Sequence, residues 1–215
     1  MGKIKINIPR ILITTLVIFA SIKAYAANCP IKIGGLAPLS APGSVTGGEA
    51  MREAMLLAER DINEKGGVLG CDIKVVITDT EGLPEKAAAM MQKLITQDGV
   101  VAVGGGYHSS VGVASKDVAN SRGVPVVFAE TWNDTITGDM QKYIFRIAPL
   151  SSWASGVIWK FAAQAPGVKS VVIVTENTDY GIPAAEECAK GLSSKGISSV
   201  TFGVDIGTQD FAGIV

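Results

Sequence analysis

The chain has 215 residues, of which 47% are hydrophobic and 18% are charged. Its formal net charge is −1, and its Lys and Arg residues form no cluster after residue 26, which argues against a nucleic-acid partner. Beyond the N-terminal region, no run reaches the roughly 20 apolar residues that a membrane span takes.

The first 26 residues have the pattern of an export signal. Three basic residues precede an apolar run of twelve residues at 11–22, and Ala-Tyr-Ala at 24–26 is a small-x-small cleavage site. Because the run is shorter than a membrane span, we predict a signal peptide at 1–26, cleaved near Ala26, and an exported mature chain. The alternatives are an uncleaved anchor and a lipid anchor on Cys29, for which Asn28 is a poor preceding residue.

Three cysteines in an oxidising compartment leave one without a disulfide partner. Cys29 and Cys71 immediately precede the first two strand-like runs, so both lie at the same sheet end if those strands are parallel neighbours. We predict a Cys29–Cys71 disulfide, which would close a loop of about 43 residues and stabilise the fold by about 4 kcal/mol at most. The alternative is two unpaired buried thiols, and Cys188 falls in a helical pattern as a small core residue.

From residue 31 onward, short β-rich runs alternate with longer helical patterns. The predicted strands are residues 31–36, 73–78, 100–104, 124–128, 171–175 and 199–204. The predicted helices are residues 47–65, 84–97, 110–121, 153–165 and 183–195. This alternation predicts an α/β fold, with a parallel sheet covered by helices on both faces.

The first predicted helix has the clearest pattern. Thr46 and Glu49 have the spacing of a capping box, and Gly66-Gly67 supplies residues that tolerate the positive φ of a helix end. Its expected core-facing residues recur with a period of 3.6: Met51, Met55, Ala58 and Ile62.

The strands form two sections. We predict one lobe at 27–147 and part of a second lobe at 148–215. The second section has only two predicted strands, which cannot bury both faces of a parallel sheet. The last residues, "TQDFAGIV", have the pattern of the first turns of a helix. We therefore expect the chain to be a fragment with an incomplete second lobe.

Three loops follow predicted strands of the first section: "APLSAPGSVTGG", "GGYHSS" and "AETWND". In an open parallel sheet, ligands bind beyond the carboxyl ends of the strands, so we expect these loops to meet at one rim. Serine hydroxyls and free N–H groups at a helix start attract a carboxylate, and glycines let a ligand approach the main chain. This combination favours a binding site for a small molecule.

Catalytic interpretations fit the same residues less well. Residues 104–106 lack the G-x-G-x-x-G spacing of a dinucleotide site, and no P-loop lysine is present. His108 and Ser109 are adjacent, so their side chains point apart, and there is no G-x-S-x-G elbow. The sequence also has no cluster of His and Cys that would bind a metal. We expect no enzyme activity, no metal and no cofactor, and we expect His108 to be a residue of the rim.

The chain resembles the leucine/isoleucine/valine-type periplasmic binding proteins of ABC importers. The segments that carry the resemblance are "IKIGGLAPLSAPGSVTG", "AMLLAERDINEKGGVLGCDIKVVITDTEG", "GVPVVFAETWND", "YIFRIAPLSSW", "VVIVTENTDYG" and "GTQDFAGIV". The resemblance implies a type I periplasmic-binding fold, with two doubly wound parallel-sheet lobes that close on a ligand. It also implies a periplasmic location, an amino acid (branched-chain type) or related ligand, and an ABC permease in the inner membrane as partner.

The family's ligand contacts can be carried over by position. The family residue that contacts the ligand after the first strand corresponds to a position near Thr46. The alternative role of Thr46 is to cap the first helix. The family's carboxylate-binding serine falls on Ser109 or Ser110, for which a plain helix N-cap is the alternative. Tyr180 matches an aromatic residue that covers the ligand. Trp153 follows the crossover strand and is expected at the ligand or in the core.

The loop after the fourth strand departs from the family pattern. Amino-acid binders have small residues and a threonine there, whereas this chain has Glu130 and Trp132. A carboxylate suits a cationic or amide group, and a tryptophan offers an apolar wall or a cation–π face. The alternative is a shifted loop with Thr131 inward and Glu130 in solvent. Asp79, at the end of the second strand, is expected to order its loop.

These observations predict a periplasmic solute-binding component of an ABC importer. The alternative in the same fold is an exported ligand-sensing module of a signalling receptor. A cytoplasmic repressor is disfavoured, because the segment before residue 31 has the pattern of an export signal and not that of a DNA-binding helix-turn-helix.

Overall fold

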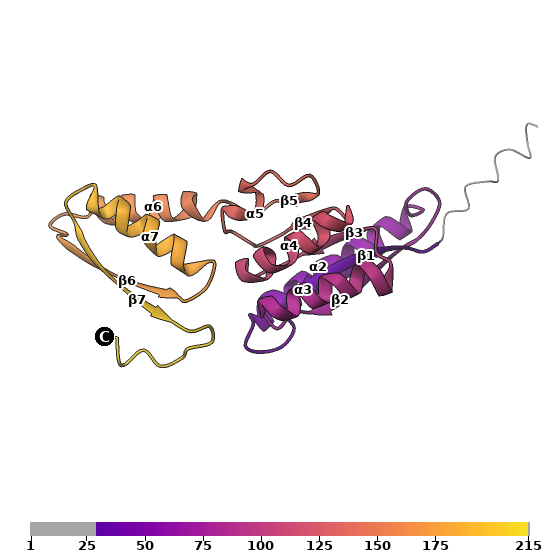
Figure 1. Ribbon diagram of the computed structural model, residues 1–215, viewed down its shortest axis with the longest axis horizontal. Helices are drawn as coiled ribbons and strands as arrows, with labels where there is room; N and C mark the ends of the chain where they lie inside the picture. The colour runs from indigo at the N-terminus through magenta and orange to yellow at the C-terminus, as the bar shows by residue number, and fades with distance from the viewer. Residues whose placement is uncertain (1–28, 215) are drawn as a thin grey trace, which may run out of the picture.

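A computed structural model of the chain describes residues 29–214 and contains two parallel sheets (Figure 1). The predicted signal peptide lies outside the described residues. The first sheet has the order β2-β1-β3-β4-β5 and the second pairs β6 with β7. The strands are β1 (Ile31–Ala37), β2 (Ile73–Asp79), β3 (Ala102–Gly105), β4 (Val126–Phe128), β5 (Ile144–Arg146), β6 (Ser170–Glu176) and β7 (Ser198–Val204).

Helices connect the strands in the alternation that the sequence predicts, so the fold class is α/β with parallel sheets. They are α2 (Val45–Glu64), α3 (Pro84–Lys93), the π-helical turn η2 (Leu94–Asp98), α4 (Ser109–Arg122), α5 (Thr135–Gly138), α6 (Ser151–Gln164) and α7 (Gly181–Ser193). The prediction missed β5 and α5, whereas η2 continues α3 and falls, except for its last residue, within the helix predicted at 84–97. β5 and α5 have only three and four residues, too few for a pattern to repeat. Among residues 29–214, none of the helices has both the length and the apolar character needed to cross a membrane.

The core of the first section lies between its sheet and the helices α3, α4 and α5. Leu36, Val103 and Phe128 are fully or almost fully buried on β1, β3 and β4. The other buried members of this cluster are Ala87, Met91, Leu94, Val100, Val111, Ala119, Val126, Ile136 and Ile144. The strands are therefore held in place by apolar burial, which leaves the loops at their carboxyl ends to carry polar groups.

The predicted capping box at the start of α2 is wrong. The helix begins at Val45 with Ser44 in the N-cap position, and no side chain caps it. Thr46 is therefore already inside the helix and is exposed, while the Glu49 carboxylate pairs with Arg52 at 2.6 Å. This end of α2 packs closely on the loop after β1, since a Cβ on Gly48 would lie 1.9 Å from the carbonyl oxygen of Pro38.

The predicted core face of α2 is only partly correct. Met51 and Met55 are half-buried and lie near β1 and β3, since their sulfurs would meet a Cβ placed on Gly105 or Gly35. Ala58 and Ile62, one and two turns further along, are exposed. This end of α2 is held to β2 by polar groups instead, since the Asn63 side chain bonds both the N–H and the carbonyl oxygen of Ile73.

The first two strands bring the predicted cysteine pair together. β1 and β2 are parallel neighbours with Ile31 opposite Ile73, so Cys29 and Cys71 meet at the same sheet end. Their sulfurs are bonded, with 5.3 Å between the Cα atoms. Cys188 is buried, and its Sγ donates to the carbonyl oxygen of Ser155 at 3.6 Å.

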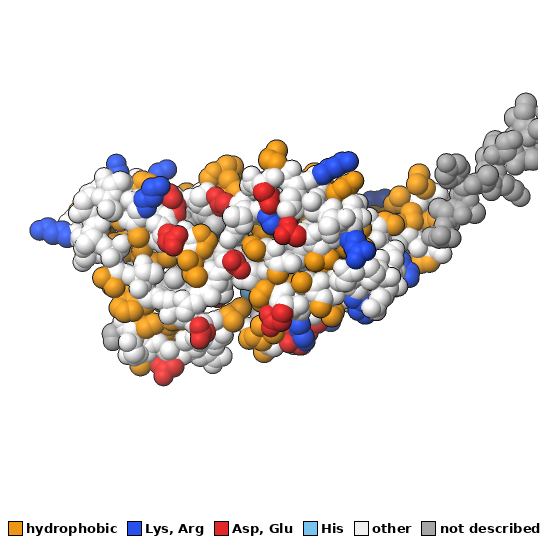
Figure 2. Space-filling view, in the orientation of Figure 1, with side chains coloured by type: hydrophobic (Ala, Val, Ile, Leu, Met, Phe, Trp, Pro, Cys, Tyr) orange, Lys and Arg blue, Asp and Glu red, His pale blue; other side chains and the backbone are white. Residues whose placement is uncertain are grey.

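The second section, β6 and β7 with α6 and α7, leaves much apolar surface exposed. A two-stranded sheet cannot bury both faces, and Figure 2 shows hydrophobic side chains at the surface over this part of the molecule. Exposed members include Val157, Ile158, Phe161, Val172, Val174, Val200 and Phe202. A hollow of about 440 Å³ between α6, α7 and β6 has a mainly apolar lining. We interpret this hollow as sheet surface that these elements do not cover.

Candidate functional site

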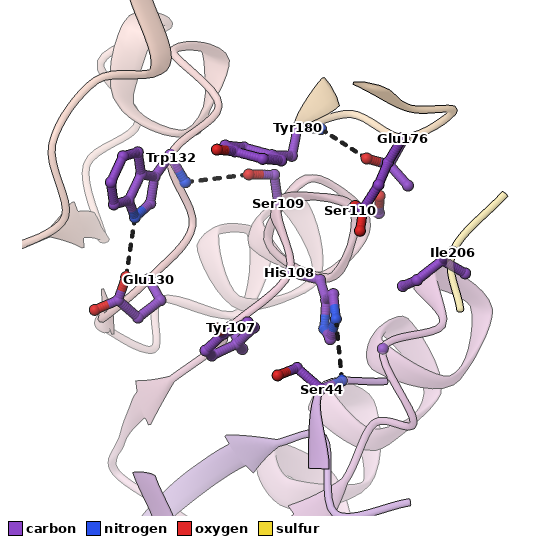
Figure 3. A pocket seen from close by; sticks show the side chains of 12 residues that line it. Ser44, Tyr107, His108, Ser109, Ser110, Glu130, Trp132, Glu176, Tyr180 and Ile206 are labelled. Carbon is purple, nitrogen blue, oxygen red and sulfur yellow. Dashed lines mark hydrogen bonds between the residues drawn. The ribbon is translucent and has the colours of Figure 1, made fainter. Parts of the chain in front are cut away.

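A cavity of about 330 Å³ lies at the carboxyl ends of the strands of both sheets (Figure 3). The loops of the first section contribute Ser44 after β1, Gly82 after β2, residues 107–110 after β3, and Glu130 and Trp132 after β4. The three loops that the sequence singles out therefore meet at one cavity. This is the position expected for a ligand site in a parallel α/β sheet.

The second section closes the other side of the cavity. Glu176 is the last residue of β6, Thr178 and Tyr180 lie between β6 and α7, and Ile206 follows β7. The Thr178 hydroxyl accepts hydrogen bonds from the N–H groups of Tyr180 at 3.3 Å and Gly181 at 3.2 Å, which fixes the loop at the start of α7. The cavity is thus lined by polar loops from both sections.

The glycines at the end of β3 allow a tight turn. Gly105 and Gly106 have φ values of 97° and 80°, in the left-handed region. A Cβ on Gly105 would lie 2.5 Å from the carbonyl oxygen of Leu36, and a Cβ on Gly106 would lie 2.8 Å from the Phe128 ring. These glycines therefore let β3 turn tightly against β1 and β4. Their expected role in the approach of a ligand to the main chain stays a prediction.

Ser109 joins the start of α4 to the loop after β4. Its side chain is only 2% exposed, and its Oγ accepts hydrogen bonds from the N–H groups of Trp132 and Asn133, both at 3.1 Å. Ser109 is the first residue of α4 and His108 is its N-cap, so the alternative role of Ser109 as a helix cap is wrong. Its hydroxyl holds the "AETWN" loop against the helix start.

Ser110, one residue further along α4, is more accessible. It lines the cavity and is half-buried, and its hydroxyl makes no hydrogen bond to another residue in the range 29–214. The first N–H groups of α4, a helix of 14 residues, lie at the same place. Together they form a set of donors suited to an anionic group.

His108 is held neutral beside these donors. Its Nε2 accepts a hydrogen bond from the Ser44 N–H at 3.3 Å, so the ring proton is on Nδ1, which is buried without a partner among the described residues. Burial lowers the pKa of His108 from its ordinary value of 6.5. The ring also packs edge-on to Tyr107, with centroids 5.2 Å apart.

Glu130 and Trp132 lie side by side at the cavity edge. The Trp132 indole N–H donates to Oε2 of Glu130 at 2.9 Å. Thr131, between them, is fully buried, and its Oγ1 has no hydrogen-bond partner among residues 29–214. Thr131 is therefore turned into the protein. Glu130 is exposed to solvent, as the alternative interpretation expects, and it also lines the cavity edge together with the half-buried Trp132.

The loop after β4 also contacts the second section. The Nδ2 of Asn133 donates to the carbonyl oxygen of Asp179, and the rings of Trp132 and Tyr180 meet edge-on. The guanidinium of Arg146 lies behind this loop and donates to the carbonyl oxygens of Trp132 at 3.3 Å and Asn133 at 3.0 Å. Burial lowers the pKa of Arg146, and the nearby charge of Asp134 acts in the opposite direction.

Two predicted site residues do not line the cavity. Thr46 is exposed inside α2, and Ser44 takes the position expected for it. Trp153 lies in the first turn of α6 and is 68% exposed, so it is in neither the cavity nor the core. The remaining predicted residues, Ser109, Ser110, Glu130, Trp132 and Tyr180, surround the same space.

Asp79 orders a loop, as the sequence predicts. Its Oδ1 accepts hydrogen bonds from the N–H groups of Leu39 at 2.8 Å and Glu81 at 2.9 Å. Burial acts to raise the pKa of Asp79, but the hydrogen bonds from Ser40, Glu81 and Leu39 outweigh it and leave the pKa below its ordinary value of 3.8. The carboxylate thus ties the loop after β1 to the loop after β2.

Other residues of the cavity were not singled out from the sequence. They include Ser44, Tyr107, Glu176, Thr178 and Ile206. The last four lie within two residues of the end of β3, β6 or β7, and Ser44 lies seven residues after the end of β1. Strand ends could therefore have indicated them. Among residues 29–214, no group of three His, Cys, Asp or Glu side chains is placed to hold a metal ion.

The family sequence profile described as "Periplasmic binding protein" matches residues 30–215. The chain belongs to the periplasmic binding protein family. Among curated members similar to it is the leucine-, isoleucine-, valine-, threonine- and alanine-binding protein of Pseudomonas aeruginosa, with 30% identity over 198 residues. That alignment covers 92% of this chain and 52% of the relative. A leucine-specific-binding protein of Salmonella typhimurium is 27% identical over 159 residues, covering 74% and 43% of the two chains.

Solved structures of binding proteins have the same fold as this chain. The branched-chain amino acid transporter substrate-binding protein LivJ of Streptococcus pneumoniae, in complex with isoleucine, is 29% identical with a TM-score of 0.73, covering 85% of this chain and 52% of that one. A solute-binding protein of an ABC transporter from Rhodopseudomonas palustris, in complex with 3,4-dihydroxybenzoic acid, is 24% identical with a TM-score of 0.75, covering 85% and 49%. The similarity establishes the type I periplasmic-binding fold. The chain spans about half the length of the curated relatives that it matches.

Proposed function

We propose that the protein is the solute-binding component of an ABC importer, which captures an amino acid or a related small molecule in the periplasm. The observation that carries this proposal is the cavity of about 330 Å³ between the two sections, lined by loops at the carboxyl ends of both sheets. Its size is within the range of small-molecule sites, which are about 300–1,000 Å³. The relatives named as amino-acid-binding proteins support the ligand class.

The first section would hold the ligand at the start of α4. A carboxylate there would accept hydrogen bonds from the Ser110 hydroxyl and from the first N–H groups of the helix, whose dipole favours negative charge. Ser109 lines the same space, but its Oγ already accepts two hydrogen bonds from the main chain. We therefore assign direct contact to Ser110 and the positioning of the loop after β4 to Ser109.

The second section would close over the ligand by a hinge movement, and Tyr180 would cover it. Closure needs contacts that exist only in the closed state, because a ligand shifts an equilibrium only by its differential affinity. Tyr180 and Glu176 come from the second section and face the loops of the first across the cavity. A membrane permease would then recognise the closed form and accept the ligand unaltered, so the protein would act without catalysis.

A thermal-shift screen tests this proposal. The purified protein is heated with branched-chain, polar and cationic amino acids, simple amines, quaternary ammonium compounds, amides and aromatic acids. A ligand at 100 times its dissociation constant should stabilise the protein by about 2.7 kcal/mol. No shift with any compound would contradict the proposal.

Matched variants then place the ligand. Ser110→Ala should weaken the binding of a carboxylate ligand, because its hydroxyl faces the cavity. Ser121→Ala is the control: Ser121 is exposed near the other end of α4 and donates only to the carbonyl oxygen of Val118. Equal affinities in the two variants would mean that the ligand does not sit at the start of α4.

A further inference from the structure

We propose that the cavity takes a ligand with a positively charged nitrogen group, and that Glu130, Trp132 and Tyr180 recognise this group. The inference rests on the proposed function and specifies the ligand class of the same cavity. It concerns a primary, secondary or quaternary ammonium group, which would make a net cation or a zwitterion a better ligand than a simple carboxylate.

The charges around the cavity favour a cation. Glu130 and Glu176 line it, on opposite sides in Figure 3, and none of the twelve lining residues is Lys or Arg. His108, the one lining histidine, is neutral because burial lowers its pKa and its Nε2 accepts a hydrogen bond. A cavity bounded by one sign of charge concentrates ligands of the opposite sign.

Two basic groups near the loop after β4 are engaged elsewhere. Arg146 donates to two main-chain carbonyl oxygens behind the loop after β4 and does not line the cavity. Lys116 is almost fully buried and pairs with Asp139 at 2.7 Å while donating to the Thr135 carbonyl oxygen. Neither of these cations is placed to neutralise Glu130, so its charge is available to a ligand.

The carboxylate of Glu130 is held in place with one oxygen unused. Oε2 accepts the Trp132 indole N–H at 2.9 Å, and Oε1 has no hydrogen bond to the part of the chain that the structure describes. The Trp132 contact fixes the side chain, so less conformational entropy is lost when a ligand binds. A neutral ring donor does not cancel the charge, so the free oxygen can accept from an ammonium group.

Two aromatic rings lie beside this carboxylate. Trp132 and Tyr180 are both cavity-lining, and their rings stand at 89° with centroids 6.2 Å apart. An organic cation is attracted to the face of a tryptophan or tyrosine ring, most strongly where water is excluded. The Trp132 ring, the Tyr180 ring and the Glu130 carboxylate therefore form three sides of a site for such a group.

The test compares ligands that share a carbon skeleton and differ in charge. Isothermal titration calorimetry measures 4-methylpentanoate, leucine and 3-methylbutylamine as one set, and benzoate, 4-aminomethylbenzoate and benzylamine as a second. Each set runs from anion through zwitterion to cation. We expect the nitrogen-bearing members to bind about tenfold or more tightly than the anion of the same set, the effect of one hydrogen bond to a charged group.

Variants assign the effect to the proposed group. Glu130→Gln keeps an acceptor for the Trp132 indole and removes the charge, so it should weaken the nitrogen-bearing ligands about tenfold and leave the anions unchanged or tighter. Trp132→Leu should weaken the same ligands. Glu186→Gln is the control, because Glu186 is exposed on α7 and lines neither hollow. Its affinities should match those of the unaltered protein.

The outcomes separate this inference from the proposed function. If anions bind as tightly as amines, or if Glu130→Gln and Glu186→Gln have equal affinities for the amines, the cation preference is wrong. The proposal of solute capture is then unaffected. If none of these ligands binds and the thermal-shift screen also finds none, the proposed function fails and the inference fails with it.

Discussion

The indole of Trp132 meets the ring of Tyr180 edge-on, with centroids 6.2 Å apart and planes at 89°. Trp132 follows β4 in the first section and Tyr180 precedes α7 in the second. The contact therefore joins loops that are separated along the chain, at the edge of the cavity. Asn133 and Asp179, the neighbours of these residues, add a hydrogen bond between the same two loops.

The Trp132–Tyr180 contact should be measurable without any ligand. A double-mutant cycle with Trp132→Ala and Tyr180→Ala should give a coupling of about 0.5–1.5 kcal/mol in the free energy of unfolding, since edge-on aromatic pairs contribute this much beyond burial. Urea unfolding followed by circular dichroism gives the four values. A reference cycle with Trp132→Ala and Val101→Ala should be additive within about 0.5 kcal/mol, because Val101 is exposed just before β3, at the opposite end of the sheet. Equal couplings in both cycles would contradict the packing.

The two adjacent serines of α4 should behave differently when altered. Ser109→Ala leaves two N–H groups of the loop after β4 without their acceptor, and this should lower the free energy of unfolding by about 1–3 kcal/mol. Ser110→Ala removes a half-buried hydroxyl without such a contact and should change stability by less than about 0.5 kcal/mol. Urea unfolding of both variants decides this. Equal effects would show that Ser109 does not hold the loop.

The disulfide should account for a large part of the stability of the first section. Cys29 and Cys71 are 42 residues apart in sequence, and the chain-entropy treatment gives at most about 4 kcal/mol for such a loop. The Cys29→Ser, Cys71→Ser double variant should therefore unfold at clearly lower urea. In denaturant, thiol titration should find one thiol before reduction and three after it, and the same count in both conditions would refute the bond.

Much of the fold could be predicted because burial on both faces of a parallel sheet demands continuous apolar runs. β2 and β6 carry that signal in Val75–Ile77 and Val171–Val174. β1 is interrupted by Lys32, and β7 mixes polar and apolar residues, so their signal is weaker. β5 has three residues and gives no repeat, so it was missed. The parallel pairing of β1 and β2, and with it the meeting of Cys29 and Cys71, followed from the alternation of strands and helices.

The site was predicted at the level of loops and less well at the level of side chains. Ser44 and Thr46 both precede the helical pattern, and the pattern alone does not decide between them; the structure has Ser44 as the N-cap. The role of Ser109 depends on the N–H groups of residues 132 and 133, more than twenty positions away, which no local pattern specifies. Trp153 was expected at the ligand or in the core because it follows the crossover strand, but it is largely exposed.

The stability of the protein should depend on pH through its single histidine. Burial lowers the folded-state pKa of His108 below 6.5, so the unfolded chain takes up a proton at a higher pH than the folded chain. The contribution of His108 is fully present above pH 6.5 and is lost as the pH falls through the folded pKa, with a slope of at most about 1.4 kcal/mol per pH unit.

His108→Gln isolates this effect. Urea unfolding at intervals from pH 7.5 to 5.0 should show a loss of stability in the unaltered protein that is absent from the variant, apart from carboxylate titration common to both. Protonation would also break the hydrogen bond in which Nε2 accepts from the Ser44 N–H. Parallel pH curves for the two proteins would mean that His108 is not buried in its neutral form.

We propose above that the cavity between the two sections captures a small molecule and releases it unaltered. Equilibrium dialysis of the protein with the strongest stabiliser from the thermal-shift screen, followed by mass spectrometry of the recovered compound, tests it most directly. The account predicts one bound molecule per chain, weaker binding by Ser110→Ala or Glu130→Gln, and recovery of the compound with its mass unchanged. Binding that both variants leave intact, or a compound recovered chemically altered, would contradict it.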